Sequence, residues 1–523
     1  MNKEYLYGER KEGRLLKMIK YGILALFAGG LLFLSYLSMK KVSTLNDYFL
    51  GDRSIGPWVS AFTYGTTYFS AVLFIGYAGK IGWGFGLSAL WIAVGNSVVG
   101  SLLAWKVLAK RTRQITMRLD AMTMPEFLES RYQSSGLKVF SSLIIFIFLV
   151  PYSASVYMGL SYFFEQVFAI PYIWALAIMV ALTALFLLLG GYLAVAITDF
   201  VQGIVMVIGI VVMIYFILTH PAAGGLAGIW DSLKQVNPEL VDIVGPPGWI
   251  PLLSLVVLTS LGSWGLPQMV QRFYTIKDEK SIKAAMIVAT LFGVLVTGAA
   301  YFIGATTHVF FDQLPLVNGV ANADLLIPQL IVKVMPEAVA FLILLLVLSA
   351  SMSTLSSLVL VSSSTLAIDL FKGFIKPDMS DKHSMLLMRL LCLAFVLLSF
   401  VIAITRPAVI LTLMAVSWGT VAGSFLAPYL YGLYWSGITK VGAWSGLISG
   451  LGISLGLSAY FQMKAQYIPL IGSLAILIPL VVVPVISLLT PGYDKQHLKE
   501  VYGDYYEEQS SFKVKELIIK MIS

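Results

Sequence analysis

The chain has 523 residues, of which 58% are hydrophobic and only 12% are charged. Soluble domains carry roughly 25% charged residues, so most of the surface of this chain must face lipid rather than water. The net charge of +8 is spread over short basic clusters between apolar runs, a pattern that argues against nucleic-acid binding. The single cysteine, Cys392, excludes an internal disulfide framework.

Apolar runs long enough to cross a membrane recur along the chain. Runs of about 20 residues between charged or turn-forming residues predict an all-α integral membrane protein with about thirteen transmembrane helices. The first is expected over residues 21–39, after an N-terminal segment of residues 1–20. The others are expected to begin near Pro57, Gly86, Val139, Tyr172, Ala194, Trp249, Ala284, Glu337, Met385, Ala408, Val441 and Ile468.

Basic residues gather in alternate connections between these spans, within 40–53, 110–131, 272–283 and 372–382. The positive-inside rule predicts that these connections are cytoplasmic. An odd number of spans then places the N-terminus outside the cell and the tail, residues 491–523, in the cytoplasm. The six basic residues among the first twenty favour the opposite orientation for the N-terminus. We expect a multi-pass protein of the cell membrane.

Two of the spans carry sequences that interrupt helices. In residues 60–70 a glycine, Gly65, is followed by β-branched and hydroxyl residues, and in residues 261–268 glycines precede Pro267. Unwound backbone inside a membrane is tolerated only where it is buried or lines a cavity. The separation of about 200 residues predicts two inverted five-helix repeats, each opening with a discontinuous helix, and a binding site near mid-membrane.

These repeats are expected over residues 57–218 and 249–436, followed by two C-terminal transmembrane helices in residues 441–490. The predicted fold is therefore a 5+5 inverted-repeat core with two discontinuous helices and additional helices at both ends.

Hydroxyl residues are densest in residues 349–357. Ala350, Ser353, Thr354 and Ser357 follow the spacing i, i+3, i+4, i+7 and so share one helix face. With free carbonyls from a broken helix opposite, this stripe would form a neutral oxygen cage that suits a small hard cation. The alternative is that these residues permit close helix packing and hydrogen-bond across an interface, as is common in membranes.

Asp199 lies at the start of another apolar stretch. A charged group there is costly, so it is a functional candidate, the alternative being a carboxylate that reaches water at the cytoplasmic end. Several polar and aromatic residues could line a small-molecule pocket, although aromatic residues also form ordinary helix contacts. The pocket candidates are Thr67, Tyr68, Ser70, Tyr152, Tyr157, Trp264 and Gln268.

Motifs for other chemistries are missing from the sequence. It contains no GxxxxGK[ST] loop and no HExxH pair, so ATP-driven transport by this chain alone and zinc hydrolysis both lack their parts. The predicted spans hold no Ser/His/Asp or His/Cys constellation, which argues against an enzyme. The four histidines are expected at or beyond helix ends: His220, His308, His383 and His497.

Several short motifs together resemble the sodium/solute symporter family over roughly residues 20–490. They are residues 46–53 (NDYFLGDR), 124–128 (MPEFL), 190–195 (GGYLAV) with Thr198 and Asp199, 271–273 (QRF), 351–357 (SMSTLSS) and 368–372 (IDLFK). The resemblance implies a leucine-transporter-type core and sodium-coupled import of a small organic solute. It makes sodium and the solute the expected ligands, and it leaves the oligomeric state open.

The same resemblance implies two sets of ion ligands. The main sodium site of the family maps onto backbone oxygens of Thr66 and Phe69, the carbonyl of Ala350 and the hydroxyls of Ser353 and Thr354. A second sodium site, known in the sialic acid branch, maps onto Ser353, Ser356, Ser357 and Asp199. The resemblance is therefore compatible with one or two sodium ions per cycle.

The expected solute follows from departures within the family. Proline transporters of the family carry an aspartate where this chain has Tyr68, and aromatic residues where it has Thr259 and Ser263. Residues 68–76 look more like the monocarboxylate, pantothenate and anion-carrying branches. The resemblance thus favours a small organic carboxylate over proline.

Two rival functions stay open from the sequence. One is proton coupling through Asp199 on the same fold. The other is a membrane module that senses a solute without moving it, which would need a separate signalling chain because the tail after Thr490 is too short for a kinase domain.

Overall fold

The computed structural model describes residues 22–38, 40, 45–189, 191–317, 319–503 and 506, and most of these residues are helical. Nine helices in this part of the chain are long and apolar enough to cross a membrane, or ten if one bent pair counts as a single span. A shorter apolar helix, Gly22–Ser38, covers most of the first predicted span. The predictions for residues 1–20 and 507–523 lie outside the described residues.

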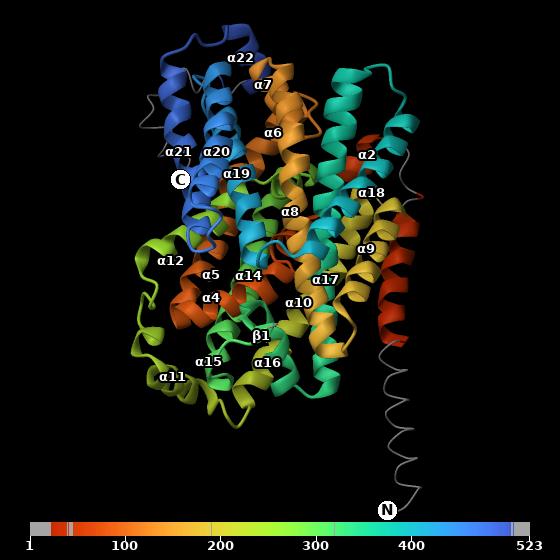
Figure 1. Ribbon diagram of the computed structural model, residues 1–523. Helices are drawn as coiled ribbons and strands as arrows, with labels where there is room; N and C mark the ends of the chain where they lie inside the picture. The colour runs from red at the N-terminus through yellow and green to blue at the C-terminus, as the bar shows by residue number, and fades with distance from the viewer. Residues whose placement is uncertain are drawn as a thin grey trace, which may run out of the picture.

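The long helices form one bundle, in which segments distant in sequence lie side by side (Figure 1). α10 packs on α17, and α19, α20 and α21 pack on one another. The long helices are the continuous helical run Val72–Arg118, α8 (Ser135–Phe168), α10 (Tyr192–Thr219), α14 (Glu279–Ala305), α17 (Glu337–Ser364), α18 (Asp381–Thr405), α19 (Ile410–Tyr434), α20 (Lys440–Tyr460) and α21 (Ile468–Leu488). The apolar helix α9 (Tyr172–Leu189) packs on α8 and α18.

Shorter elements gather at the two ends of the bundle (Figure 1). At the upper end lie α6 (Lys110–Arg118), α7 (Met124–Tyr132) and α22 (Lys495–Tyr502). Toward the lower end lie α11 (Gly225–Val236), α15 (Thr307–Phe310), α16 (Leu326–Val334) and the hairpin of β1 (Leu316–Val317) and β2 (Val320–Ala321). The basic cluster of residues 110–118 therefore lies at the upper end, which distinguishes the two faces electrostatically.

The first interrupted helix breaks four residues later than its glycine suggests. α3 (Pro57–Tyr68) is followed by Phe69 in an extended conformation (φ −110°, ψ 92°), and the chain resumes as η2 (Val72–Tyr77) and α4 (Ala78–Phe85). Gly65 lies inside α3, because its missing side chain serves packing. A Cβ there would lie 2.4 Å from the ring of Phe292 on α14.

The second interrupted helix bends where its proline indicates. α12 (Trp249–Val256) continues through η7 (Val257–Leu261) and η8 (Gly262–Gly265) to Leu266, which is extended, and α13 (Pro267–Thr275) then leaves at an angle of 47°. Proline suits the first position of a helix because it has no N–H to leave unpaired.

The two interrupted helices are joined directly at one end. The N–H of Ile55, before α3, donates to the carbonyl of Thr275 at 3.2 Å, and the N–H of Lys277, after α13, donates to the carbonyl of Ile55 at 3.0 Å. This short bridge holds the start of α3 against the end of α13.

α4 and α14 cross in backbone contact at a pair of glycines. A Cβ at Gly304 would lie 1.8 Å from the carbonyl oxygen of Ala78, and one at Gly82 would lie 2.1 Å from the carbonyl carbon of Gly304. No larger residue fits at either position without moving a helix.

The C-terminal helix α22 is fastened by a buried arginine. Arg131 Nε donates to the carbonyl of Gly432 at 3.3 Å and to the hydroxyl of Tyr502 at 3.0 Å, and Nη2 donates to the carbonyl of Trp435 at 3.2 Å. The guanidinium also lies 5.4 Å from the ring of Tyr493. One side chain thus joins α7, the end of α19 and α22.

Candidate functional site

The hydroxyl stripe of α17 faces the last turn of α3. Ser353 Oγ donates to Thr66 Oγ1 at 2.8 Å, and Thr354 Oγ1 lies 3.2 Å from the carbonyl oxygens of both Thr66 and Thr67. All four side chains are buried. Because α3 ends at Tyr68, the N–H of Phe69 is the last to bond back into the helix, to the carbonyl of Gly65 at 3.0 Å, and the carbonyls of Thr66 and Thr67 have no following helical N–H to accept from. The break therefore leaves backbone oxygens facing hydroxyl oxygens.

This cluster of oxygens has the chemistry of an alkali-cation site. Carbonyl and hydroxyl oxygens can replace the hydration shell of a hard cation, and the C-terminal end of a half-helix adds partial negative charge. Phe69, two residues after Thr67, carries a further carbonyl at the break, and Ala350 lies one turn before Thr354 on the same face of α17. The five residues expected for the first sodium site therefore come from two adjoining segments.

The residues expected for a second sodium site lie next to this cluster, together with a cation that the sequence reasoning did not include. Arg272 on α13 places Nη2 3.6 Å from Asp199 Oδ2 on α10. The same nitrogen donates to Thr67 Oγ1 at 2.7 Å and to Ser357 Oγ. Ser356 instead donates its hydroxyl to the carbonyl of Met352 in its own helix.

A small cavity lies beside the break in α3. Three of the expected solute-binding residues line it: Tyr68, Ser70 and Tyr152. The other expected residues, Thr67, Tyr157, Trp264 and Gln268, are buried elsewhere. The remaining lining residues are Phe69, Val72, Leu73, Tyr77, Asn96, Thr259, Tyr301, Met414 and Trp418.

Asn96 organises the polar side of this cavity. Its Oδ1 accepts from the hydroxyls of Tyr68 at 3.3 Å, Thr259 at 2.8 Å and Ser260 at 3.0 Å. Aromatic rings close another side, since Tyr68 stacks on Trp418 with ring centroids 5.9 Å apart. Sequence reasoning missed Asn96 and Trp418. Asn96 could have been found as the single amide side chain within the apolar residues 86–109, whereas nothing in the sequence distinguishes Trp418 from the other tryptophans.

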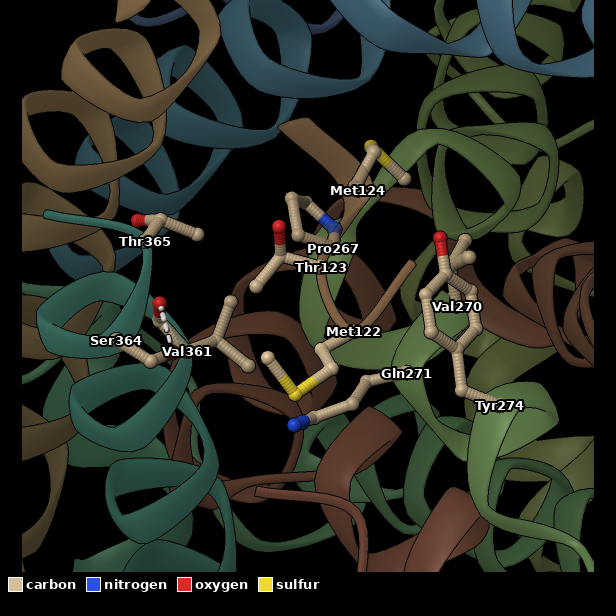
Figure 2. Close-up of a pocket in the computed structure, with 10 residues that line it drawn as sticks. All are labelled: Met122, Thr123, Met124, Pro267, Val270, Gln271, Tyr274, Val361, Ser364 and Thr365. Carbon is tan, nitrogen blue, oxygen red and sulfur yellow. Dashed lines mark hydrogen bonds between the residues drawn. The ribbon is translucent and has the colours of Figure 1, made fainter. Parts of the chain in front are cut away.

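A second small cavity lies two to three helical turns further along α17. Figure 2 shows side chains from three separate segments around it. The first contributes residues 122–124, before and at the start of α7, the second is α13, and the third is the end of α17. The lining residues are Met122, Thr123, Met124, Pro267, Val270, Gln271, Tyr274, Val361, Ser364 and Thr365.

Among the described residues, no group of three or more histidine, cysteine, aspartate or glutamate side chains could hold a metal ion. One histidine, His308, makes other contacts: its ring stacks on the ring of Trp83, and its Nε2 shares a hydrogen bond of 2.8 Å with the carbonyl oxygen of Trp83.

Comparisons with known proteins identify the family of this chain. A sequence model of the sodium:solute symporter family matches residues 48–450. The osmoregulated proline transporter OpuE of Bacillus subtilis (strain 168) is 33% identical over 443 residues, covering 82% of this chain and 86% of the relative. The sodium/proline symporter of Escherichia coli (strain K12) is 29% identical over 426 residues, covering 80% of this chain and 84% of the relative.

Solved structures show the same fold. A Na⁺-coupled sialic acid symporter, in a substrate-bound outward-open state, superposes with a TM-score of 0.72 at 19% identity. The match covers 91% of this chain and 98% of that symporter. At this identity the likeness concerns the path of the backbone and says nothing about the solute.

Proposed function

Because the chain belongs to the sodium:solute symporter family, we propose that it imports a small carboxylate-bearing nutrient together with sodium by alternating access. One observation carries the proposal. At a helix interruption deep in the bundle, the hydroxyl of Thr354 lies 3.2 Å from the carbonyl oxygens of both Thr66 and Thr67.

The first sodium ion is held in this proposal by the carbonyls of Thr66, Phe69 and Ala350 and the hydroxyls of Ser353 and Thr354. The packing alternative explains the hydroxyl contacts alone. The ion explains in addition why the stripe faces a helix end, where carbonyls lack a helical N–H partner, rather than a continuous helix.

The solute lies in the cavity bounded by Tyr68, Ser70, Tyr152, Asn96 and Trp418. No lysine or arginine lines this cavity within the described residues, so a carboxylate needs another partner. The chain resumes its helical path just after Ser70, whose Oγ accepts from the N–H of Val72 at 3.1 Å and whose carbonyl accepts from the N–H of Leu73 at 3.0 Å. The N-terminal end of this half-helix carries partial positive charge, which attracts a carboxylate. A solute carboxylate binds there, and the apolar part of the solute contacts the aromatic rings.

Proline is the first solute to test, because OpuE and the related symporters are proline transporters. Tyr68 stands where proline transporters of the family carry an aspartate. Its hydroxyl donates to the carbonyl of Thr259 at 2.6 Å, so the ring closes one wall of the cavity. A wall of this kind favours a solute without a positively charged group, because no carboxylate is present at this position to pair with one.

The architecture proposed for the membrane has thirteen spans. The helix of residues 21–39 precedes the inverted repeats 57–218 and 249–436, and two helices in 441–490 follow them. The similar positions of the two interruptions, each near the start of its repeat, support this division. The upper end in Figure 1 carries α6 and its basic residues, which supports a cytoplasmic face there, with the N-terminus outside and the tail 491–523 inside.

In the proposed cycle, sodium enters from outside and ties the end of α3 to α17. This contact fixes the break, which forms one wall of the solute cavity. The outer side then closes, and both ligands leave through the second cavity, between α7, α13 and α17 (Figure 2). One sodium ion gains about 2.3 kcal/mol from 100 mV and about 1.4 from a tenfold gradient, enough for about 500-fold accumulation of a neutral solute.

The test is uptake by purified protein reconstituted in liposomes. Labelled proline, other amino acids and monocarboxylates are offered under an inward sodium gradient, with no pH gradient and with potassium as the control cation. The proposal expects uptake of at least one carboxylate that sodium drives and potassium does not. Uptake that follows only an imposed pH gradient would favour proton coupling through Asp199, and saturable binding without uptake would favour a sensor.

A further inference from the structure

The cavity between α7, α13 and the end of α17 is lined by hydroxyl groups whose hydrogens are engaged elsewhere (Figure 2). Ser364 Oγ donates to the carbonyl of Val361 at 2.8 Å, and Thr365 Oγ1 donates to the carbonyl of Ser362 at 3.0 Å. A hydroxyl group has one hydrogen and two lone pairs. These two side chains therefore offer only oxygen lone pairs to the cavity.

Gln271 on α13 brings a further acceptor to the same cavity. Its Nε2 donates to the carbonyl of Phe49 at 3.1 Å, whereas its Oε1 has no hydrogen-bond partner. The side chain is only 8% exposed. A buried amide oxygen without a partner is costly, and this one belongs to a residue that lines a cavity. The cavity thus presents oxygen atoms that suit a hard cation.

Asp369 places a carboxyl group next to this cavity. It belongs to η10 (Thr365–Ile375), which continues α17, and it is fully buried. Its Oδ1 accepts from Thr123 Oγ1 at 2.8 Å, and Thr123 lines the cavity, while its Oδ2 has no hydrogen-bond partner. Within the part of the chain that the structure describes, no lysine or arginine forms a salt bridge with Asp369. A buried carboxylate in this position needs a cation.

The groups around Asp369 are committed to other partners. Thr123 is the N-cap residue of α7, and its Oγ1 accepts from the N–H of Glu126 at 3.1 Å, so its single hydrogen is directed to Asp369. Lys138 on α8 acts on Asp369 electrostatically, but its Nζ is paired with Glu129 Oε2 at 2.8 Å. One ammonium group thus serves two carboxylates, and a second cation beside Asp369 would balance the charge.

The cavity continues the helix face on which the first sodium site lies. Val361 and Thr365 follow Thr354 at i+7 and i+11, so the three share one face of the helix. Asp369 lies about four helical turns beyond Thr354, on the side of the basic helix α6 that is proposed to be cytoplasmic. An ion that leaves the first site in this direction meets these oxygens next.

We propose that this cavity is a sodium site on the exit path, in which Gln271, Ser364 and Thr365 supply neutral oxygens and Asp369 supplies the charge. We call these four residues the exit site. The inference rests on the proposed sodium-coupled function. Because the carboxylate lies behind Thr123, the exit site binds sodium more weakly than the first site. Release through successive weak sites lets an ion leave without crossing the protein unligated.

Thermal unfolding of the purified full-length protein in detergent tests the proposal with sodium alone as the probe. Sodium replaces potassium at constant ionic strength, so a specific site raises the melting temperature. The wild-type protein is expected to show two steps, of which the one at lower sodium concentration belongs to the first site. Asp369→Asn removes the charge and keeps an acceptor for Thr123. It should retain the first step and move the second to a sodium concentration at least about tenfold higher.

Asp381→Asn is the matched control for the charge. Asp381 is paired with Lys372 at 2.7 Å at the exposed start of α18, so its loss should leave both steps within about twofold of the wild type. Thr365→Val covers the case in which Asp369→Asn does not fold. Valine keeps the branched shape of threonine and removes its oxygen, so the second step should again require more sodium. Thr365→Ser keeps the oxygen and should keep the second step.

Two results would overturn the inference and leave sodium coupling intact. They are a single sodium step in the wild-type protein, and a second step that neither Asp369→Asn nor Thr365→Val moves by more than about twofold. If Asp369→Asn changes only the pH dependence of the melting temperature in potassium, the carboxyl group carries a proton instead, and the inference is also overturned. A wild-type protein without any sodium step would overturn the proposed function as well.

Discussion

The substitution Thr354→Val tests the first sodium site directly. Valine keeps the branched shape of threonine, so helix packing is preserved, but it removes the hydroxyl that lies 3.2 Å from the carbonyls of Thr66 and Thr67. A hydrogen bond or polar contact to a charged group contributes about 1.5–3 kcal/mol. Since about 1.4 kcal/mol corresponds to tenfold, the dissociation constant for sodium should rise about tenfold to hundredfold.

The assay needs no knowledge of the solute. A ligand that binds only the folded protein raises its melting temperature, so the sodium dependence of thermal unfolding, with potassium held at constant ionic strength, reports the affinity. Ser351→Ala is the matched control, because Ser351 is buried in the same helix but donates its hydroxyl to the carbonyl of Val347 at 2.6 Å.

The reasoning is refuted if Thr354→Val, with a melting temperature in potassium close to that of the wild type, shifts the sodium midpoint by less than about twofold. In that case the hydroxyl stripe serves helix packing alone. An equal shift in Ser351→Ala would also count against the site, since it would show that any change in α17 weakens sodium binding.

Three further predictions concern packing and the cavity. Gly304→Ala should lower the free energy of unfolding by about 1–3 kcal/mol or more, and with it the melting temperature, because the added methyl group would lie 1.8 Å from the carbonyl oxygen of Ala78. Gly298→Ala on the same helix places its methyl group in open space and should leave the melting temperature unchanged. Asn96→Ala should raise the solute KM in uptake assays about tenfold while sodium binding by ²²Na⁺ dialysis is unchanged. Arg131→Lys should destabilise the protein by about 2–4 kcal/mol in thermal unfolding, because a lysine cannot reach all the acceptors of the guanidinium.

Each of these predictions has an outcome that contradicts it. Equal melting temperatures for the two alanine variants of α14 would mean that the helices do not cross in backbone contact. A parallel loss of sodium binding and solute affinity in Asn96→Ala would place the amide in a general structural role. An unchanged melting temperature in Arg131→Lys would show that α22 is held by other contacts.

The sequence predicted the larger features because each has a local cause. A lipid environment requires long apolar helices, so the helical bundle could be predicted from the sequence. Proline has no N–H to donate within a helix, so the bend after η8, at Pro267, could be predicted as well. The shared face of Ser353, Thr354 and Ser357 followed from helical periodicity, and the structure places that face against α3.

The features that the sequence did not predict depend on contacts between distant segments. Gly65 suggested a break at its own position, but it lies within α3 because the ring of Phe292 needs the space. Arg272 belonged to a recognised motif, yet nothing local showed that its guanidinium would reach Thr67 and Ser357. Trp418 joins the cavity only because α19 packs beside the interruption, which no periodicity reveals.

The glycine crossing of α4 and α14 has a consequence for how the protein moves. An interface made by side chains can adjust when their rotamers change, but the backbone contact between α4 and α14 has no rotamers to change. We therefore expect these two helices to move together as a rigid body. Displacement must then be absorbed at Phe69 and Ser70, where the helical path is already interrupted. Paired spectroscopic labels across that contact would keep a constant separation throughout the cycle, and labels placed across the junction of α13 and α17 would not.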